Sequence, residues 1–420
     1  MPIIVYVFID ILTVSIASSH WFQSADCQRS HWKTHKPACR SKNPYVGIYE
    51  ISTLPDGPGG EDGVTQCILF KGMKKALLQL PTIPVARPSS PCHQIAVVPG
   101  AGLGMLASRP IKATELIYAE RPLLMSPWGP IPMNQAQAMA EWERLCGQAL
   151  ARMSQEDQDA YRALTGGPSL VGVAGNNGFE ASGILAVFQS VLPEMNNQRT
   201  TLNHSFVTTG KIISRANHSC KPNAGVFVDP RSLSMQLIAT KDIAQDEEIV
   251  VAYCNLTSQY ANRKKELDPY GFVCACSLCV DPERSDKQIM RILTFQRRFL
   301  IDDGLFDEWL RVPSLPDDHL EKQLLEGLSL MREEGMHDTP EYLFLVGKLV
   351  KVYAALENLE RMRQCVGWSL AAQLTKGGYR TIEQRQAVIG TVTPDSPDLK
   401  QYWGKRKRNN PTANCKGRSG

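Results

Sequence analysis

Short runs of β-branched and other apolar residues alternate with turn residues through the middle of the chain. They fall at residues 95–98, 116–118, 224–228, 235–238 and 248–251. Short apolar runs between turn signals are typical of strands. Between the second and third runs, residues 134–164 place apolar side chains at helical spacing,. The pattern therefore predicts a small, mostly β domain that carries an inserted helical segment.

Apolar residues recur every three or four positions through the last third of the chain. The stripes run from Ile289 to Phe299, from Leu320 to Met331, from Leu345 to Leu356 and from Leu359 to Leu370. Each predicts one amphipathic helix. Four such helices in a row resemble tetratricopeptide packing, although the repeat has no fixed period. A helical bundle that covers the β domain explains the same pattern, so the expected fold class is α+β.

These patterns divide the chain into six segments. Residues 1–43 hold an apolar stretch and a Cys/His cluster, and residues 44–91, rich in Pro and Gly, are expected to be a linker with some short strands,. Residues 92–256 form the β domain with its insert, 257–284 a cysteine-bearing loop, and 285–380 the helical domain. Residues 381–420 are expected to be a disordered basic tail that includes Lys405–Arg408,, although such a basic run also fits a nuclear import signal or a polyanion-binding patch.

Composition narrows the classes of partner. The 420 residues carry 46 basic and 42 acidic side chains, a net charge of +4, which is too balanced for a surface built wholly to bind nucleic acid. No sequence-specific nucleic-acid partner is expected. The apolar stretch from Ile3 to Ala17 contains Asp10 and is shorter than the ~20 residues that cross a bilayer,. We therefore expect no membrane association, and a location in the nucleus or cytoplasm.

Three of the 12 cysteines, Cys274, Cys276 and Cys279, fall within six residues. A cluster in a long chain favours a metal over a disulfide framework. Tetrahedral zinc takes four ligands, so a fourth ligand must come from elsewhere in the chain. A redox pair with one spare thiol, or three thiols without metal, are the alternatives.

A second cluster lies near the amino end. His35 and Cys39 are four residues apart, which places them on one face of a helix, and Cys27 precedes them,. The run Cys27-Gln-x-x-His-Trp-x-x-His35-Lys-x-x-Cys39 resembles the second half of a MYND zinc finger. A whole finger of this kind binds two zinc ions through eight ligands, and Met1–Phe22 contains no Cys-x-x-Cys pair. Because metal binding folds such modules, this half-finger is expected to bind zinc weakly or not at all.

The motif of most interest is Arg215-Ala-Asn-His-Ser-Cys220-Lys-Pro-Asn223. Ile249–Tyr253 follows about thirty residues later, then Tyr270-Gly-Phe-x-Cys-x-Cys-x-x-Cys279, and Gly100-Ala-Gly-Leu-Gly104 precedes it. Those four elements in that order resemble the SET-domain protein lysine methyltransferases over residues 95–280. Together with the finger remnant they resemble the MYND/SET group, in the order found in fungal members.

The resemblance implies a binding site for S-adenosylmethionine. Its glycine turn would lie against the cofactor because a missing side chain allows close approach, and an aromatic side chain would cover the adenine. The expected cofactor-binding residues are Gly100, Ala101, Gly102, Ser214, Ala216, Asn217, His218, Tyr253 and Phe272.

The resemblance also implies a zinc-bound post-SET loop and two catalytic tyrosines. Cys220 would supply the fourth ligand to Cys274, Cys276 and Cys279. Tyr253 and Tyr270 would line the channel in which the acceptor lysine meets the methyl group. An aromatic, desolvated channel lowers the pKa of a lysine from about 10.4 and so provides the neutral amine.

The implied function is methyl transfer from S-adenosylmethionine to a lysine of a histone or another protein, with structural zinc and with peptide partners bound by the helical domain. In-line methyl transfer needs neither a metal nor a covalent intermediate, so positioning provides most of the catalysis. An inactive adaptor or a zinc-dependent transcriptional regulator is the alternative, because a fold does not fix its chemistry. The intact Asn217-His218 pair and both tyrosines favour the enzyme.

Overall fold

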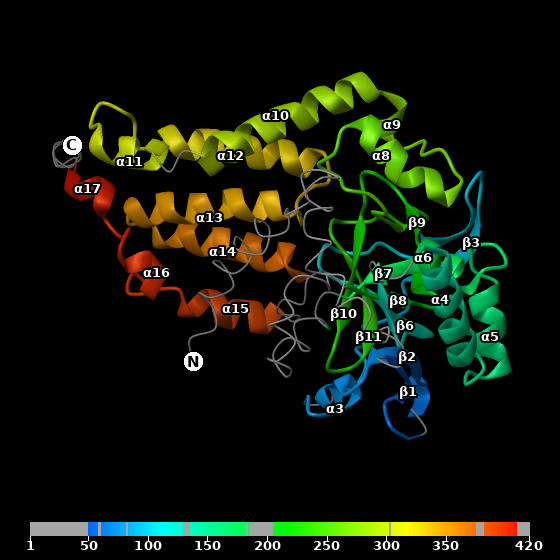
Figure 1. Cartoon of the computed structure of the whole chain (residues 1–420). Helices are drawn as coiled ribbons and strands as arrows, with labels where there is room; N and C mark the ends of the chain where they lie inside the picture. The colour runs from blue at the N-terminus through cyan, green and yellow to red at the C-terminus, as the bar shows by residue number, and fades with distance from the viewer. Residues whose placement is uncertain are drawn as a thin grey trace, which may run out of the picture.

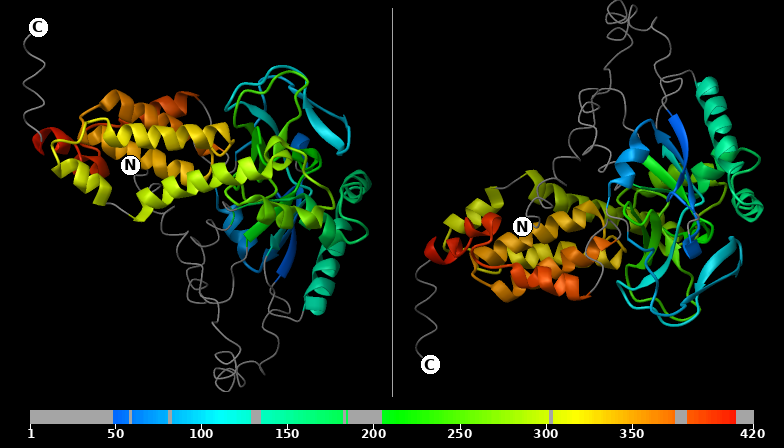
Figure 2. Two further views of the ribbon diagram at one scale, coloured as in Figure 1. Left: turned by 90° about the horizontal axis from the view of Figure 1, so that it is seen from above. Right: turned by 90° about the horizontal axis from the view of Figure 1, so that it is seen from below.

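The computed structural model describes residues 49–57, 60–80, 83–128, 135–181, 184, 205–301, 304–374 and 382–409. A β-rich body lies on one side and a body of stacked helices on the other (Figure 1). The helices run outward from the β-rich body in both views of Figure 2. This arrangement agrees with the predicted β core and helical carboxy-terminal region.

Four small sheets build the β-rich body. The largest has the order β1-β2-β6-β8-β7, the second has the order β10-β11-β5, and the other two are the pairs β3-β4 and β12-β9. The strands are β1 Tyr49–Leu54, β2 Thr65–Phe70, β3 His93–Val98, β4 Gly102–Ala107, β5 Leu116–Glu120, β6 Leu124–Trp128, β7 Gly178–Glu180, β8 Ser205–Thr209, β9 Asn217–His218, β10 Ala224–Asp229, β11 Ser234–Ala239 and β12 Val250–Val251. Each of the five predicted runs contributes to one of these strands.

The stretch expected to be a linker with some short strands contributes two strands to this body. Strands β1 and β2 pair antiparallel over their full lengths, and all six residues of β2 are buried. Helix α3, Met73–Leu78, follows and buries Met73 and Leu77. The ring of Phe70 packs edge-on against that of Phe206, with 5.9 Å between centroids. Pro and Gly lie in the turns around β1 and β2. Their breaking effect on strands dominates the composition of this stretch, so the bounds of the short apolar strand β2 could not be predicted from it.

The predicted insert, residues 134–164, contains the helices α4 Gln135–Leu150 and α5 Gln155–Arg162, and the insert extends beyond this range through a third helix, α6 Leu170–Asn177. Trp142 and Tyr161 lie in its core with Ile68 of β2. Glu143 accepts the N–H groups of Leu170 and Val171 at 2.8 and 3.1 Å, satisfying donors that the first turn of α6 leaves unpaired,. The insert is thus fastened to the large sheet and ends at the residues that precede β7.

The helical body contains the four predicted helices and four more. It consists of α10 Pro282–Ile301, α11 Gly304–Arg311, α12 His319–Glu333, α13 Pro340–Ala355, α14 Leu359–Ala372, α15 Ile382–Thr391, α16 Pro397–Lys400 and α17 Lys405–Asn409. Thr339 and Asn358 cap α13 and α14 through their side-chain oxygens,. Helices α12, α13 and α14 pack one after another around Leu324, Leu345 and Met362.

The expectation of a disordered tail is wrong for residues 382–409. Helix α17 contains the basic run, and Arg406 is fully buried within it. The guanidinium donates to the carbonyls of Trp309, Val312 and Leu315 and to Asp317. It lies 5.1 Å from the ring of Trp309. A buried arginine needs such partners, and composition alone does not show them.

The two bodies meet beside the residue that follows Cys220. A Cβ built on Gly335, in the turn between α12 and α13, would lie 3.2 Å from Cγ of Lys221. Arg385 of α15 donates to Oγ1 of Thr114 at 3.2 Å, and Leu256 packs into the helical core. Within the described ranges, we find no helix whose length and apolar content would let it span a bilayer.

Candidate active site

Two distant segments come together as the parallel pair β9 and β12. Asn217 pairs with Val250 and His218 with Val251, and the N–H of Ser219 donates to the carbonyl of Val251 at 3.0 Å. The predicted motif 215–223 therefore lies directly against the predicted run 249–253.

Tyr253 is held at three points. Its N–H donates to Nδ1 of His218 at 2.9 Å, and its hydroxyl donates to the carbonyl of Ala216 at 2.7 Å. Its ring stacks on that of Tyr270 with centroids 4.9 Å apart. Burial raises the pKa of Tyr253, and the neighbouring Tyr270 and Glu248 raise it further. The hydroxyl therefore stays protonated at neutral pH.

Phe272 stands at the edge of this aromatic group. Its ring centroid lies 6.0 Å from that of His218 and 6.3 Å from that of Tyr270, and its side chain is 37% exposed. It follows the turn η5, Asp268–Tyr270, which ends at Gly271 with a left-handed φ of 76°. The structure thus gathers both predicted catalytic tyrosines and the predicted adenine-covering ring.

The predicted glycine turn connects β3 to β4. Gly100 and Gly102 both have φ of 78°, a conformation that favours glycine, and the N–H of Ala101 between them donates to the carbonyl of Val98. The side-chain amide of Asn217 donates to the carbonyl of Leu103 at 3.3 Å and to Oε1 of Glu248 at 2.8 Å. The turn is therefore fixed to the Asn-His strand.

Gly104 is the glycine that this contact requires. A Cβ at that position would lie 2.7 Å from Nδ2 of Asn217 and 2.8 Å from Oε1 of Glu248. Neither atom can move without breaking the bond that joins Asn217 to Glu248. The third glycine of Gly100-Ala-Gly-Leu-Gly104 therefore maintains the site through packing.

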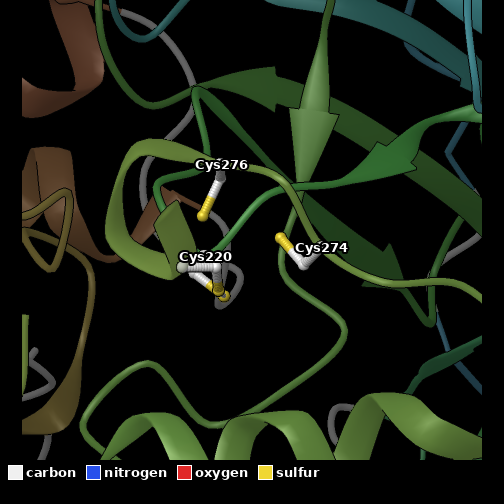
Figure 3. A group of neighbouring side chains, drawn as sticks. Cys220, Cys274 and Cys276 are labelled. Atoms are coloured by element: carbon white, nitrogen blue, oxygen red, sulfur yellow. Dashed lines mark hydrogen bonds between the residues drawn. The ribbon is translucent and has the colours of Figure 1, made fainter. Parts of the chain in front are cut away.

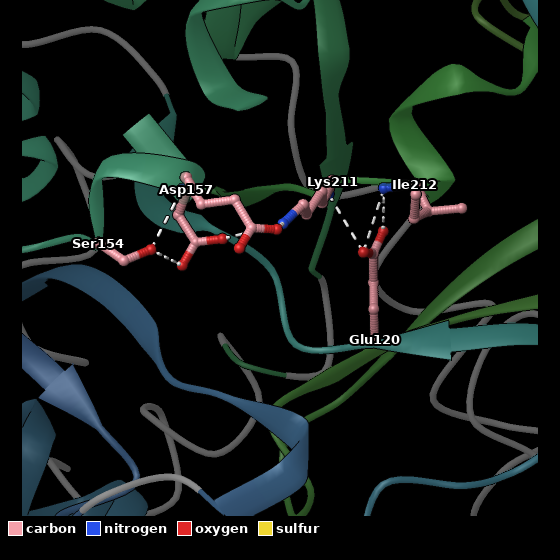
Figure 4. Close-up of polar contacts among 6 residues, drawn as sticks. Glu120, Ser154, Asp157, Lys211 and Ile212 are labelled. Atoms are coloured by element: carbon pink, nitrogen blue, oxygen red, sulfur yellow. Dashed lines mark hydrogen bonds and ion pairs between the residues drawn. The ribbon is translucent and has the colours of Figure 1, made fainter. Parts of the chain in front are cut away.

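Ser214 is buried, and its hydrogen bonds hold the segment that leads into the Asn217–His218 strand. Its hydroxyl donates to the carbonyl of Asn177 at 2.8 Å and accepts the N–H of Gly210 at 2.9 Å. The carboxylate of Glu120 accepts the N–H groups of Lys211, Ile212 and Ile213, at 2.7–3.2 Å. Figure 4 shows Glu120 beneath this turn, with Lys211 reaching toward the insert, where it pairs with Glu156 and Asp157.

A cleft of about 320 Å³ opens beside the tyrosines, and Ser214, Tyr253 and Tyr270 line it. Sequence reasoning missed several other lining residues, which come from the insert end, β7, the residues after β12 and α8, Tyr260–Leu267. They include Asn176, Asn177, Glu180, Cys254, Asn255 and Glu266. The run Asn176-Asn177-Gly178 at the start of β7 interrupts the apolar residues of the insert with polar ones. This interruption is the feature of the sequence from which these lining residues could have been predicted.

Four thiols converge next to this cleft. The sulfur atoms of Cys220, Cys274, Cys276 and Cys279 all lie within 4.8 Å of one another, and those of Cys220 and Cys279 are 3.5 Å apart. Figure 3 shows the labelled three with their sulfurs turned toward one another. Tetrahedral zinc with Zn–S bonds of about 2.3 Å spaces its sulfurs by about 3.8 Å. The set therefore fits one zinc ion, and Cys220 provides the fourth thiol that the trio lacked.

Two more groups adjoin these thiols. Nε2 of His218 lies 3.3 Å from Sγ of Cys220, and Sγ of Cys254 lies 4.0 Å from the same sulfur. The side chain of His218 is therefore directed at the thiols and at the backbone of Tyr253. The predicted finger ligands Cys27, His35 and Cys39 lie outside the described residues.

The comparisons with known proteins agree with this geometry. Residues 102–254 match the family model described as the SET domain. Over these residues the chain is similar to the SET domain. The match begins at Gly102 of the glycine turn and ends just after Tyr253, so it encloses the insert and the paired strands β9 and β12.

Several curated relatives match part of this chain. The chain is 27% identical over 199 residues to "Histone-lysine N-methyltransferase set5" of Schizosaccharomyces pombe, an alignment that covers 47% of this chain and 53% of that protein. It is 37% identical over 71 residues to "Histone-lysine N-methyltransferase ATXR2" of Arabidopsis thaliana, covering 16% of this chain and 15% of that protein. The chain thus spans about half the length of the first relative and much less of the second.

Among solved structures, the SET domain of LSMT bound to lysine and AdoHcy aligns with 80% of this chain and 88% of its own. The sequence identity is 14% and the TM-score is 0.25. A likeness at that score adds nothing to the assignment, which depends on the sequence match and on the site.

Proposed function

We propose that this protein transfers a methyl group from S-adenosylmethionine to the side-chain amine of a lysine in a protein. The observation that carries the proposal is the stacked pair Tyr253 and Tyr270 at a cleft that also exposes Glu180 and Glu266. Among the residues that line this cleft, all of them described, none is Lys or Arg. A cleft with carboxylates and no basic side chain attracts a positively charged sulfonium, and it attracts the substrate lysine while that lysine is still an ammonium.

The hydroxyl of Tyr253 is suited to orient a neutral amine. Its proton is donated to the carbonyl of Ala216, which leaves its oxygen lone pairs to accept an N–H of the lysine. Loss of the ammonium proton to water comes first, because only the neutral amine has a free electron pair. The nitrogen then forms a bond to the methyl carbon as the carbon–sulfur bond breaks, and the sulfonium becomes a neutral thioether. The aromatic walls favour this order because they disfavour the charged ammonium.

The cofactor would lie between the β3–β4 turn and Phe272. Leu103 and Phe272 are 47% and 37% exposed, and both adjoin the Asn217–His218 strand. A flat adenine covers such surfaces well. Gly100, Ala101 and Gly102 are exposed, and we propose that their backbone contacts the cofactor.

Structural zinc would hold the post-SET loop. The four thiols come from β9–β10 and from the segment that follows Phe272, so one ion at Cys220, Cys274, Cys276 and Cys279 would fasten that segment to the Asn-His strand. Cys27, His35 and Cys39 are proposed to belong to a reduced MYND finger of fungal type. "SET domain and MYND-type zinc finger protein 6" of Schizosaccharomyces pombe, 35% identical over 69 residues, supports the pairing of these modules.

The remaining features of the proposal concern partners and location. The consecutive packing of α12, α13 and α14 supports a tetratricopeptide-like surface for peptide partners,. Histones are one candidate substrate class, in agreement with the names of the relatives. Free cysteines throughout the described part of the chain support a reducing compartment, the nucleus or cytoplasm,.

Calorimetry with S-adenosylmethionine tests the proposal. We expect binding by the zinc-loaded protein, and loss of most of that binding in Asn217→Ala, which removes the amide that joins the strand to Leu103. Mass spectrometry of histone mixtures incubated with the protein would then detect added methyl groups on lysine. A folded, zinc-loaded protein that binds no S-adenosylmethionine would refute the enzyme and favour an adaptor.

A further inference from the structure

The imidazole of His218 joins two parts of the site that are otherwise separate. Nδ1 lies 2.9 Å from the backbone nitrogen of Tyr253, and Nε2 lies 3.3 Å from the sulfur of Cys220. The ring therefore spans from a catalytic tyrosine to one of the four thiols that fit zinc.

The bond to Tyr253 fixes the tautomer of this ring. A backbone N–H only donates, so Nδ1 must accept. A neutral imidazole that accepts at Nδ1 carries its proton on Nε2. The proton on Nε2 then points toward Cys220.

That tautomer excludes His218 as a metal ligand through Nε2, although His218, Cys220 and Cys254 lie close enough together to form a ligand set. A nitrogen that carries a proton has no lone pair for a metal. It is instead a donor, and at 3.3 Å from sulfur it is placed to bond a thiolate. Hydrogen bonds to a metal's ligands orient those ligands and adjust metal affinity.

We propose that His218 is a positioning residue that donates its Nε2 proton to the zinc-bound thiolate of Cys220 while its Nδ1 holds the backbone of Tyr253. The inference rests on the zinc site and on the role of Tyr253 in the proposed function. Zinc binding and the placement of the catalytic hydroxyl are then linked through one ring. Sγ of Cys254 lies 3.9 Å from Nε2 of His218 and 4.0 Å from Sγ of Cys220. In this proposal Cys254 is a neighbour of the zinc site and not a fifth ligand.

Two substitutions separate the halves of this linkage. His218→Asn keeps an acceptor near the position of Nδ1 and removes the Nε2 donor. His218→Gln carries an amide N–H₂ to the position of Nε2 and removes the acceptor for Tyr253. We expect zinc affinity, measured by chelator competition, to fall by about 10- to 100-fold in His218→Asn and to stay within a few-fold of wild type in His218→Gln.

Spectroscopy supplies readouts that a purely structural role would not change. With Co²⁺ in place of zinc, the thiolate-to-cobalt charge-transfer band should shift in His218→Asn and stay in place in His218→Gln. In the unsubstituted zinc protein, long-range nitrogen–proton NMR of labelled histidine should show the proton of His218 on Nε2. A proton on Nδ1 would overturn the proposal, and this measurement needs no variant to fold.

The other outcomes are equally defined. Zinc affinity and cobalt band both unchanged in His218→Asn would refute the bond to Cys220. An unchanged kcat in His218→Gln would refute the hold on Tyr253, whereas a lower kcat at retained zinc affinity supports it. Cys254→Ser should keep one zinc per chain, and loss of zinc would refute the assignment of Cys254 as a neighbour. A wild-type protein that transfers no methyl group refutes the proposed function while the zinc measurements still test Nε2.

Discussion

At the scale of single residues, the hydroxyl of Tyr253 is the atom on which the proposed chemistry depends most. It is held by the carbonyl of Ala216, and its ring is held by Tyr270. Both contacts exist before any substrate arrives, so the oxygen is already placed. An oriented polar group needs no reorganisation in the transition state, and this is where catalytic hydrogen bonds gain their strength.

Tyr253→Phe removes this oxygen and keeps the ring. We expect kcat for lysine methylation to fall by about 10²- to 10³-fold, the usual loss for one oriented catalytic group, while the affinity for S-adenosylmethionine changes only a few-fold. Rates from methyl-group counting and calorimetry on the same samples check both halves. An equal loss of cofactor binding would show that Tyr253 acts through the cofactor site and not on the amine.

Glu120 gives the protein a pH dependence. Burial raises the pKa of Glu120 to about 7, against the opposing effect of the N–H donors from Ile213, Ile212 and Lys211. A carboxyl whose folded pKa is raised stabilises the fold most below its unfolded pKa of about 4.5, and that contribution is lost as pH rises toward 7. Relative to Glu120→Gln, the wild-type free energy of unfolding should therefore fall by about 3 kcal/mol between these values.

Urea unfolding of both proteins across this pH range measures the difference. Glu120→Gln removes the titration and leaves the other carboxyls in place, so it serves as the reference at each pH. A wild-type stability that rises with pH relative to this variant would mean that the three N–H donors outweigh burial and hold Glu120 ionised.

At the scale of elements, helix α17 shows how a basic run becomes core. Arg406 is fully buried against α11 and the turn that follows it, whereas Arg408 is exposed. Lys407 pairs with Glu357 at the end of α13 at 2.9 Å. Helix α17 thus closes the end of the helical body that lies farthest from the β-rich body (Figure 1).

Arg406→Met tests this closing role. It leaves the carbonyls of Trp309, Val312 and Leu315 without their donor in a buried place, so we expect the free energy of unfolding to fall by about 3–5 kcal/mol. Arg408→Met is the matched control and should change it by less than about 0.5 kcal/mol. Thermal melts followed by circular dichroism would compare them. Equal effects of both substitutions would contradict the assigned role of Arg406.

The helices and strands also show which parts of the fold could be predicted from the sequence. Apolar stripes such as Leu345–Leu356 placed helices correctly because one buried face repeats at helical spacing. The bounds and the complete burial of β2 were not predicted, because burial on both faces leaves no alternation to detect and the flanking Gly and Pro are typical of a linker. Arg406 was missed because its partners are carbonyls nearly a hundred residues away. The direction of the His218 ring also could not be predicted from the sequence, because a sequence motif does not determine the rotamer of a side chain.

At the scale of the whole molecule, the four thiols join the β-rich body to the segment that leads into the helical body. Cys279 lies in α9, Ser277–Val280, directly before α10. Zinc at this place would therefore determine both the aromatic wall of the cleft and the start of the helical body.

Removal of zinc should then have wide effects. We expect Cys276→Ser to lose the single zinc ion, to lower the melting temperature and to abolish binding of S-adenosylmethionine. Cys146→Ser, which changes a buried cysteine of the insert, should keep zinc and cofactor binding. Metal analysis by mass spectrometry and calorimetry would test both variants. A second zinc per wild-type chain would indicate that the finger remnant also binds, and a zinc-free but active Cys276→Ser would refute the structural role.

The parallel pairing of β9 with β12 has a consequence for how the protein is made. Asn217 finds its partner only when Val250 has left the ribosome, and the thiols after Phe272 emerge later still. A growing chain thus carries an incomplete pocket for most of its synthesis. Cofactor capture is then a late event, which follows release of the second crossing segment and cannot guide the early steps of folding.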